Sequence, residues 1–171
     1  MILEIIQYTL PVLIVSVIFF LVVNAFLKSE DTRRKISLSL EQDRLIIPLR
    51  LQAYERLILF LERITPDALL LRVDYSQMNC RTLQGELLRI IRSELEHNYT
   101  QQLYISSEAW QRVKLARDKI IQLINMATEG TTAGMPAQAL AHNIMTRMMN
   151  EEKNPCTEAI EFLKKEARTL F

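Results

Sequence analysis

Glycine is very scarce in this sequence, with three residues among 171, at positions 85, 130 and 134. A phosphate-binding loop or a dinucleotide-binding fingerprint needs glycines at fixed spacing between a strand and a helix. The segment Gly130–Gly134 precedes an expected helix, but it contains no lysine and follows no expected strand. The shortage of glycine therefore argues against a nucleotide-binding protein.

Histidine and cysteine are equally scarce, with two residues of each. His97 follows Glu94 by three positions, whereas di-iron helical bundles need two such Glu-x-x-His motifs and two further carboxylates. His142 has no acidic residue three or four positions away. Cys80 and Cys156 are too isolated for a disulfide framework or a zinc site. We therefore expect no cofactor, and a metal-binding or catalytic bundle that uses Glu94 and His97 is kept as an alternative.

An excess of charge of one sign is also missing. The chain has 21 Lys and Arg against 20 Asp and Glu, which gives a formal net charge of +1. Nucleic-acid-binding domains usually carry a clear basic excess, often with aromatic residues between the basic ones. Neither feature is present, so we expect no nucleic-acid partner.

A long apolar run near the start of the chain is the strongest positive signal. No charged residue occurs between Glu4 and Lys28. Its members include Leu10, Pro11, Phe19, Phe20 and Val23. About 20 apolar residues in a helix cross a hydrocarbon core of about 30 Å, so we expect residues 1–27 to form a transmembrane anchor. A cleaved signal peptide is less favoured, because the run lacks a basic n-region and exceeds an h-region of roughly 7–15 residues.

Basic residues follow this run but do not precede it. They are Lys28, Arg33, Arg34 and Lys35. Segments rich in Lys and Arg stay on the cytoplasmic side of a membrane. We therefore expect the N-terminus outside the cell and the rest of the chain in the cytoplasm.

Apolar residues then recur at helical spacing after a polar juxtamembrane linker, residues 28–47. Pro48 is interpreted as a helix start. The residues that step by four and three along this helix are Ile47, Leu51, Tyr54, Ile58 and Leu61. The breadth of the apolar face favours a bundle core, since a coiled coil needs such a seam over three or four heptads. Leu59 interrupts the polar side, either as an isolated exposed leucine or as a partner contact.

Further helical segments follow along the chain. They are a short helix from Thr65-Pro66 through Leu71, one from about Thr82 to Asn98, one capped by Ser106 or Ser107, one from Pro136 to Asn150, and one from Asn154 onwards. Gly85 inside the second of these suggests a close neighbour. We predict an all-α fold: an N-terminal transmembrane helix followed by a small bundle of about four to five helices. Residues 48–129 are expected to form the main bundle, and residues 130–171 a C-terminal helical pair packed on it.

Two segments, Pro48–Leu57 and Glu96–Tyr104, resemble a family of uncharacterised bacterial single-pass membrane-anchored α-helical proteins. The resemblance implies a setting in the inner (plasma) membrane and no known activity. Packing alone does not explain the charged residues of these segments, so we hypothesise that Glu55 or Arg56 meets the Glu94–His97 region across a helix pair. The resulting candidate interaction network is Arg50, Glu55, Arg56, Leu59, Glu94, Glu96 and His97.

These features together predict a non-enzymatic, membrane-anchored interaction protein, most simply a small accessory subunit or adaptor of an inner-membrane complex. It would contact lipid through the anchor and a protein partner through its helices. A homo-oligomeric membrane-tethered scaffold, assembled through the Ile47–Leu61 seam, is the first alternative, and the metal-binding or catalytic bundle is the second. Most methionines in the last third of the chain are interpreted as core filler, and Ile144–Met149 is the place to look for a peptide-binding groove.

Overall fold

A computed structural model describes residues 44–151 and 153–170, together with a few earlier ones: Phe19, Phe20, Val23, Asn24, Lys28, Glu30 and Glu41. The chain divides into two compact units, Met1–Ile46 and Ile47–Phe171. Every described residue of the first unit is helical. Most of the expected anchor and linker, including Leu10, Pro11 and Arg33–Lys35, lies outside the described residues. No described helix is both long and apolar enough to cross a membrane.

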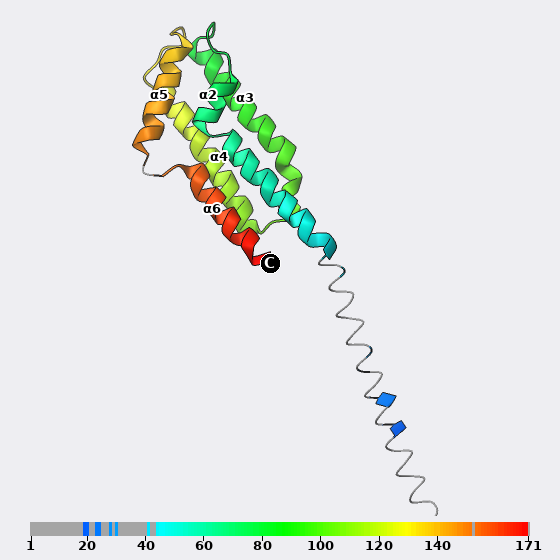
Figure 1. Ribbon diagram of the computed structural model, residues 1–171. Coiled ribbons are helices and arrows are strands. Elements are labelled where there is room, and N and C mark those ends of the chain that lie inside the picture. Colours follow the sequence, from blue (N-terminus) through cyan, green and yellow to red (C-terminus); the bar gives the residue numbers. More distant parts are fainter. Residues whose placement is uncertain are drawn as a thin grey trace, which may run out of the picture. The chain divides into compact units, whose positions relative to one another are not determined.

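The second unit is built of helices throughout its described residues (Figure 1). The first covers residues 47–63. It is followed by α2 (Pro66–Arg72), α3 (Cys80–Asn98), α4 (Ser107–Thr128), α5 (Ala137–Asn150) and α6 (Pro155–Ala167), with short 3₁₀ turns at Tyr99–Leu103 and Arg168–Leu170. The all-α class of this part is thereby confirmed, with six helices when the short α2 is included.

Apolar stripes spaced for a helix form one continuous core in this unit. The 47–63 helix contributes Tyr54, Leu57, Phe60 and Leu61, each at most 1% exposed. The facing stripe of α3 contains Leu83, Leu87, Ile91 and Leu95, and α4 to α6 add further buried residues such as Trp110, Ile144 and Leu163. Burying one face of each helix is what stabilises helices of this length. Leu49, near the start of this helix, stays outside the core, with 47% of its surface exposed.

Side chains at the helix starts explain where three helices begin. The Asn79 side chain accepts from the Thr82 backbone N–H at 2.9 Å, so α3 starts at Cys80 and not at Thr82. Ser106 accepts from the Ala109 N–H at 3.0 Å and caps α4 as expected. Asn154 caps α6 through the Cys156 N–H at 2.9 Å. These caps satisfy donors that the first turn of a helix leaves without partners.

Three local expectations are wrong. Residues 44–47 are already helical, so Pro48 does not start its helix and is accommodated with the loss of one backbone donor. Thr65 does not cap α2, because its hydroxyl donates to the Glu62 carbonyl at 3.0 Å. Gly85 does not make room for a close neighbour, since a Cβ at this position would meet no atom within 4 Å.

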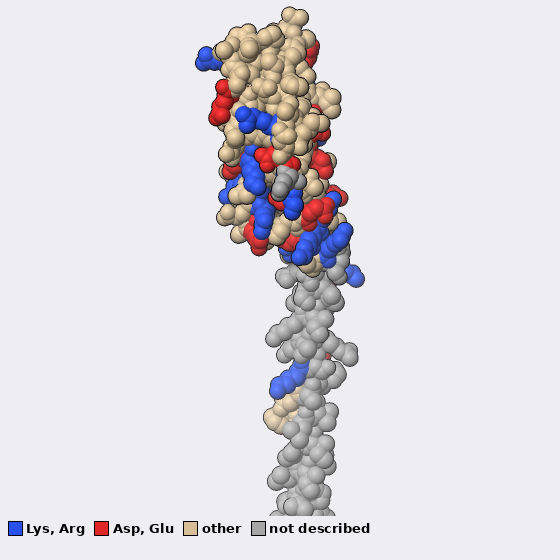
Figure 2. Space-filling view, turned by 90° about the vertical axis from the view of Figure 1, so that its left-hand side faces the viewer, with Lys and Arg blue, Asp and Glu red and all other residues tan. Residues whose placement is uncertain are grey.

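The C-terminal helices belong to the same core as the earlier ones. α6 packs mainly against α4, and α5 packs against α4, α3 and α2. Figure 2 shows the side of the molecule on which α5 and α6 lie: charged side chains crowd its lower half, and the upper half has few of them. The two halves of this face therefore differ sharply in polarity.

Candidate functional site

A groove runs between the 47–63 helix and the C-terminal half of α3, where the candidate network was expected. It encloses about 470 Å³. Its lining residues are Arg56, Leu59, Phe60, Arg63, Ser93, Glu94, His97 and Asn98. We call it the Glu94 groove. It brings Arg56 and Leu59 of one helix close to Glu94 and His97 of another, which are four of the seven candidate residues.

The Glu94 carboxylate is held by two arginines from different helices. Arg72 Nη1 donates to Oε1 at 2.9 Å, and Arg63 Nη1 donates to Oε2 at 3.4 Å. Arg72 also donates to the backbone carbonyl of Arg63. The Glu94 side chain is 17% exposed, so these bonds tie α2, α3 and the 47–63 helix together at a partly buried point.

The protonation of Glu94 follows from these contacts. Partial burial opposes the charged form, but the hydrogen bonds and positive charges of Arg72 and Arg63 outweigh it and lower the pKa of the Glu94 carboxyl. The carboxylate therefore stays ionised at neutral pH, with both oxygens engaged. A group in this state is poorly suited to act as a general base.

His97 lies beside Glu94 but turns its ring toward its own helix. Its Nδ1 donates to the Ser93 carbonyl at 2.6 Å, which leaves Nε2 as the second polar atom of the exposed ring. No group of three or more potential metal ligands occurs among the described residues. The Glu94–His97 pair therefore has no third ligand in this part of the chain, and its carboxylate is already bound by arginines.

The other three candidates lie outside the groove. Arg50 donates from Nε to the Tyr104 carbonyl at 3.1 Å and so fixes the turn after α3 to the start of the 47–63 helix. Glu55 and Glu96 are exposed, and no described residue forms an ion pair with either. The hypothesis that Glu55 or Arg56 meets the Glu94–His97 region therefore named the correct pair of helices. The residue of the 47–63 helix that forms the ion pair with Glu94 is Arg63.

Residues from distant parts of the chain complete a second polar network that the sequence did not reveal. The Glu166 carboxylate accepts from the Tyr54 hydroxyl at 2.5 Å, from the Ser106 hydroxyl at 2.7 Å and from the Ser106 N–H at 3.2 Å. Burial, then the hydrogen bond and the charge of Glu166, raise the pKa of Tyr54 to about 12, although Arg50 acts in the opposite direction. Tyr54 therefore remains a donor, and the network joins α6 to two other helices.

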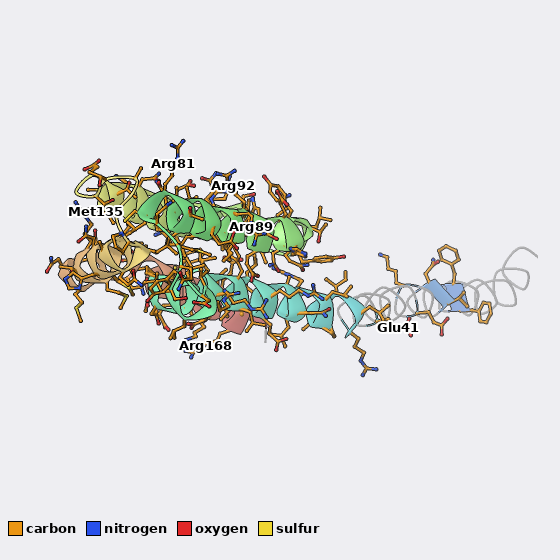
Figure 3. The ribbon with its side chains drawn as sticks, turned by 90° about the horizontal axis from the view of Figure 1, so that it is seen from above. Glu41, Arg81, Arg89, Arg92, Met135 and Arg168 are labelled. Atoms are coloured by element: carbon orange, nitrogen blue, oxygen red, sulfur yellow. The ribbon has the colours of Figure 1, made fainter. Side chains whose placement is uncertain are left out.

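Basic residues also line the outer face of α3, away from both networks. Arg81, Arg89 and Arg92 project outward from this helix (Figure 3). Arg89 pairs with Glu86 of the same helix at 2.6 Å. An exposed pair within one helix contributes little to stability, so this face is best regarded as a solvated surface.

A second groove lies beside part of the methionine-rich segment that the sequence marked as a place to look for a peptide-binding groove. It encloses about 500 Å³ between α2, the turn after it and α5. Its lining residues are Asp67, Leu70, Leu71, Tyr75, Gln138, Ala141, His142 and Met145. We call it the α2–α5 groove. From the expected segment only Met145 lines it: Ile144 is buried in the core, and Met149 lies further along α5 with 81% of its surface exposed.

Comparison with known proteins identifies a family but no characterised relative. No curated protein and no solved structure matches the chain. The sequence profile of DUF7935, described as a family of unknown function, matches residues 1–170. This agrees with the resemblance to an uncharacterised family. The chain therefore belongs to the DUF7935 family.

Proposed function

We propose that this chain is a non-enzymatic, membrane-anchored interaction protein, an accessory subunit or adaptor of an inner-membrane complex. The observation that carries the proposal is the charge-free run between Glu4 and Lys28, followed by basic residues and not preceded by any. Such a run suits a single transmembrane helix, and the basic residues that follow it favour a cytoplasmic position for the helical unit.

The chemistry of the helical unit supports a binding role over a catalytic one. The carboxylates of Glu94 and Glu166 each accept hydrogen bonds on both oxygens from residues elsewhere in the chain. Cys156 is fully buried, and burial followed by the charges of Glu62 and Asp67 raises the pKa of its thiol to about 12. A thiol in that state is a poor nucleophile. These groups stabilise the fold, and the Glu94 groove and the α2–α5 groove are among the hollows that the surface offers to other molecules.

Membrane association and orientation are tested together by cysteine labelling in intact bacteria. The native Cys80 and Cys156 are buried and give little background, so a reporter cysteine is introduced at exposed Leu115 and another at Ile2. With a membrane-impermeant maleimide, Ile2→Cys should react in intact cells, and Leu115→Cys only after permeabilisation. Alkaline extraction should leave both variants in the membrane pellet. Labelling of Leu115→Cys in intact cells, or release by alkali, would refute the proposal.

The homo-oligomeric scaffold assembled through the Ile47–Leu61 seam has less support. Tyr54 and Leu61 of that seam are at most 1% exposed within a single chain, and Ile58 packs against the same core. A second copy could reach these side chains only if the helix left its own bundle. Self-association, if the chain uses it, needs a different surface.

A further inference from the structure

The α2–α5 groove combines an apolar pocket with an apolar side chain that stands beside it. The short helix α2 turns Leu69 and Leu70 into the core, at 0% and 8% exposure. The next residue, Leu71, is 86% exposed and forms part of the groove wall. A leucine this exposed, adjacent to a pocket lined by Tyr75 and Met145, gives one surface both a protruding side chain and a cavity that can receive one.

The polar groups of the groove are self-complementary as well. They include one carboxylate, Asp67, which accepts hydrogen bonds, and one imidazole, His142, which can donate one, and no described residue pairs with Asp67. The half of the α5 side that Figure 2 shows at the top carries few other charges. A strongly acidic or strongly basic partner is therefore not favoured. A surface with both an acceptor and a donor is suited to its own copy, because a two-fold axis brings residue i against j and j against i.

We propose that the α2–α5 groove is the contact surface for a second copy of this chain. Two chains meet about a two-fold axis, with Leu71 of each copy in the groove of the other and Asp67 of each beside His142 of the other. The outward face of α5 extends the contact along the positions Gln138, His142, Met145 and Met149. At 1.5 Å per residue this face is about 16 Å long.

The expected dimer is weak and reversible. Stable complexes bury about 800 Å² on each partner, and a contact centred on one small groove falls at or below this size. Confinement of both copies to one membrane raises their effective concentration, so the dimer forms more readily there than in solution. That last step rests on the proposed membrane anchor, whereas the contact itself does not.

The test is a disulfide cross-link between two differently tagged full-length copies in one cell, one with Leu71→Cys and the other with Met145→Cys. Mild oxidation of isolated membranes should give a product that carries both tags, because the two sulfurs face each other across the dimer. The matched control pairs Leu115→Cys with Leu59→Cys, whose parent residues are 57% and 54% exposed on other faces. A cross-link no stronger than that of the control pair would overturn the proposal, as would a cross-link of Leu71→Cys to a different protein.

A second measurement uses the purified full-length protein in mild detergent. Sedimentation should show mass that rises with protein concentration, and Leu71→Glu should raise the concentration needed for dimerisation by roughly tenfold or more. Leu115→Glu should leave it unchanged. Both leucines are exposed, so neither change should disturb folding, which the helical circular dichroism signal checks. A monomer at all concentrations overturns the proposal. Release of the chain by alkaline extraction would refute the anchor alone, since dimerisation in detergent is measured without it.

Discussion

The Glu94 groove and the α2–α5 groove differ in which of their side chains lack a partner within the chain. In the Glu94 groove the partly buried carboxylate meets two arginines, and the histidine beside it bonds to its own helix. In the α2–α5 groove the lining is mostly apolar, Leu71 projects from it, and Asp67 has no partner among the described residues. The first groove therefore contributes to the stability of the single chain. The second groove keeps an exposed apolar side chain and a carboxylate that no contact among the described residues covers.

Leu70 and Leu71 give the strongest test of this difference, because they are neighbours on α2 with opposite surroundings. Leu70→Ala should lower the free energy of unfolding by roughly 2–4 kcal/mol, since it removes buried contacts and leaves a cavity. Leu71→Ala should change it by less than about 0.5 kcal/mol. Denaturant unfolding can be followed by the fluorescence of Trp110, the only tryptophan of the chain. Equal losses for both variants would mean that α2 is packed differently.

Glu94→Ala should have the next largest effect. Loss of the carboxylate leaves Arg72 and Arg63 without their partner, and we expect a cost of about 1–2 kcal/mol in the free energy of unfolding. A double-mutant cycle with Arg72→Ala should give a coupling of about 0.5–1 kcal/mol, because the pair is only partly shielded from solvent. Arg89→Ala with Glu86→Ala, an exposed pair within α3, is the control and should couple more weakly. No coupling between Glu94 and Arg72 would contradict the stabilising role of this groove.

The sequence predicted the helices and their buried faces well, because both depend on local spacing. The stripe of α4 from Trp110 to Ala127 is buried at helical spacing, and Ser106 and Asn154 cap their helices as expected. The start of α3 was missed by two residues, since Asn79 and Thr82 can both begin a helix and only the bond between them decides. Local pattern thus predicted the ends of α2 to α6 to within about one turn, but it did not predict the start of the helix that contains Pro48.

The candidate site could be predicted only in part, because its contacts are set by packing between helices. The motif Glu94–His97 and the nearby charges of the 47–63 helix pointed to the right helix pair. The partners of Glu94 did not follow, since Arg72 reaches it only through the direction that α2 takes after Pro66. Tyr54 and Glu166 are separated by 112 positions, and no periodicity connects them. Likewise Leu71 looked like an ordinary member of an apolar run until the fold turned it outward.

The pH dependence of stability should separate the two grooves further. The pKa of Glu94 is lowered in the folded chain, so its contribution is present above the unfolded value of about 4.3 and is lost as the pH falls through the folded value. The difference in unfolding free energy between the wild type and Glu94→Gln should therefore be largest near neutral pH and should shrink as the pH falls below about 4. The contributions of the other carboxylates cancel in this difference, because both proteins contain them. Leu71→Ala, in the α2–α5 groove, removes no titratable group and should leave the pH dependence of stability unchanged. A difference for Glu94→Gln that does not shrink on acidification would contradict the comparison.

The smallest expected effect concerns the charges that share the Glu94 region without joining its ion pairs. No described residue pairs with Arg56 or Glu96, and both are exposed. Arg56→Ala and Glu96→Ala should each change the free energy of unfolding by less than about 0.5 kcal/mol, and their coupling should be zero within about 0.3 kcal/mol. Denaturant unfolding of the two single variants and the double variant measures this, with the Arg72–Glu94 cycle as the positive reference. A coupling above about 0.5 kcal/mol would show that these two side chains meet in solution. The 47–63 helix and α3 would then be joined by an ion pair with Glu96, outside the Glu94 groove, as well as by the Arg63–Glu94 pair within it.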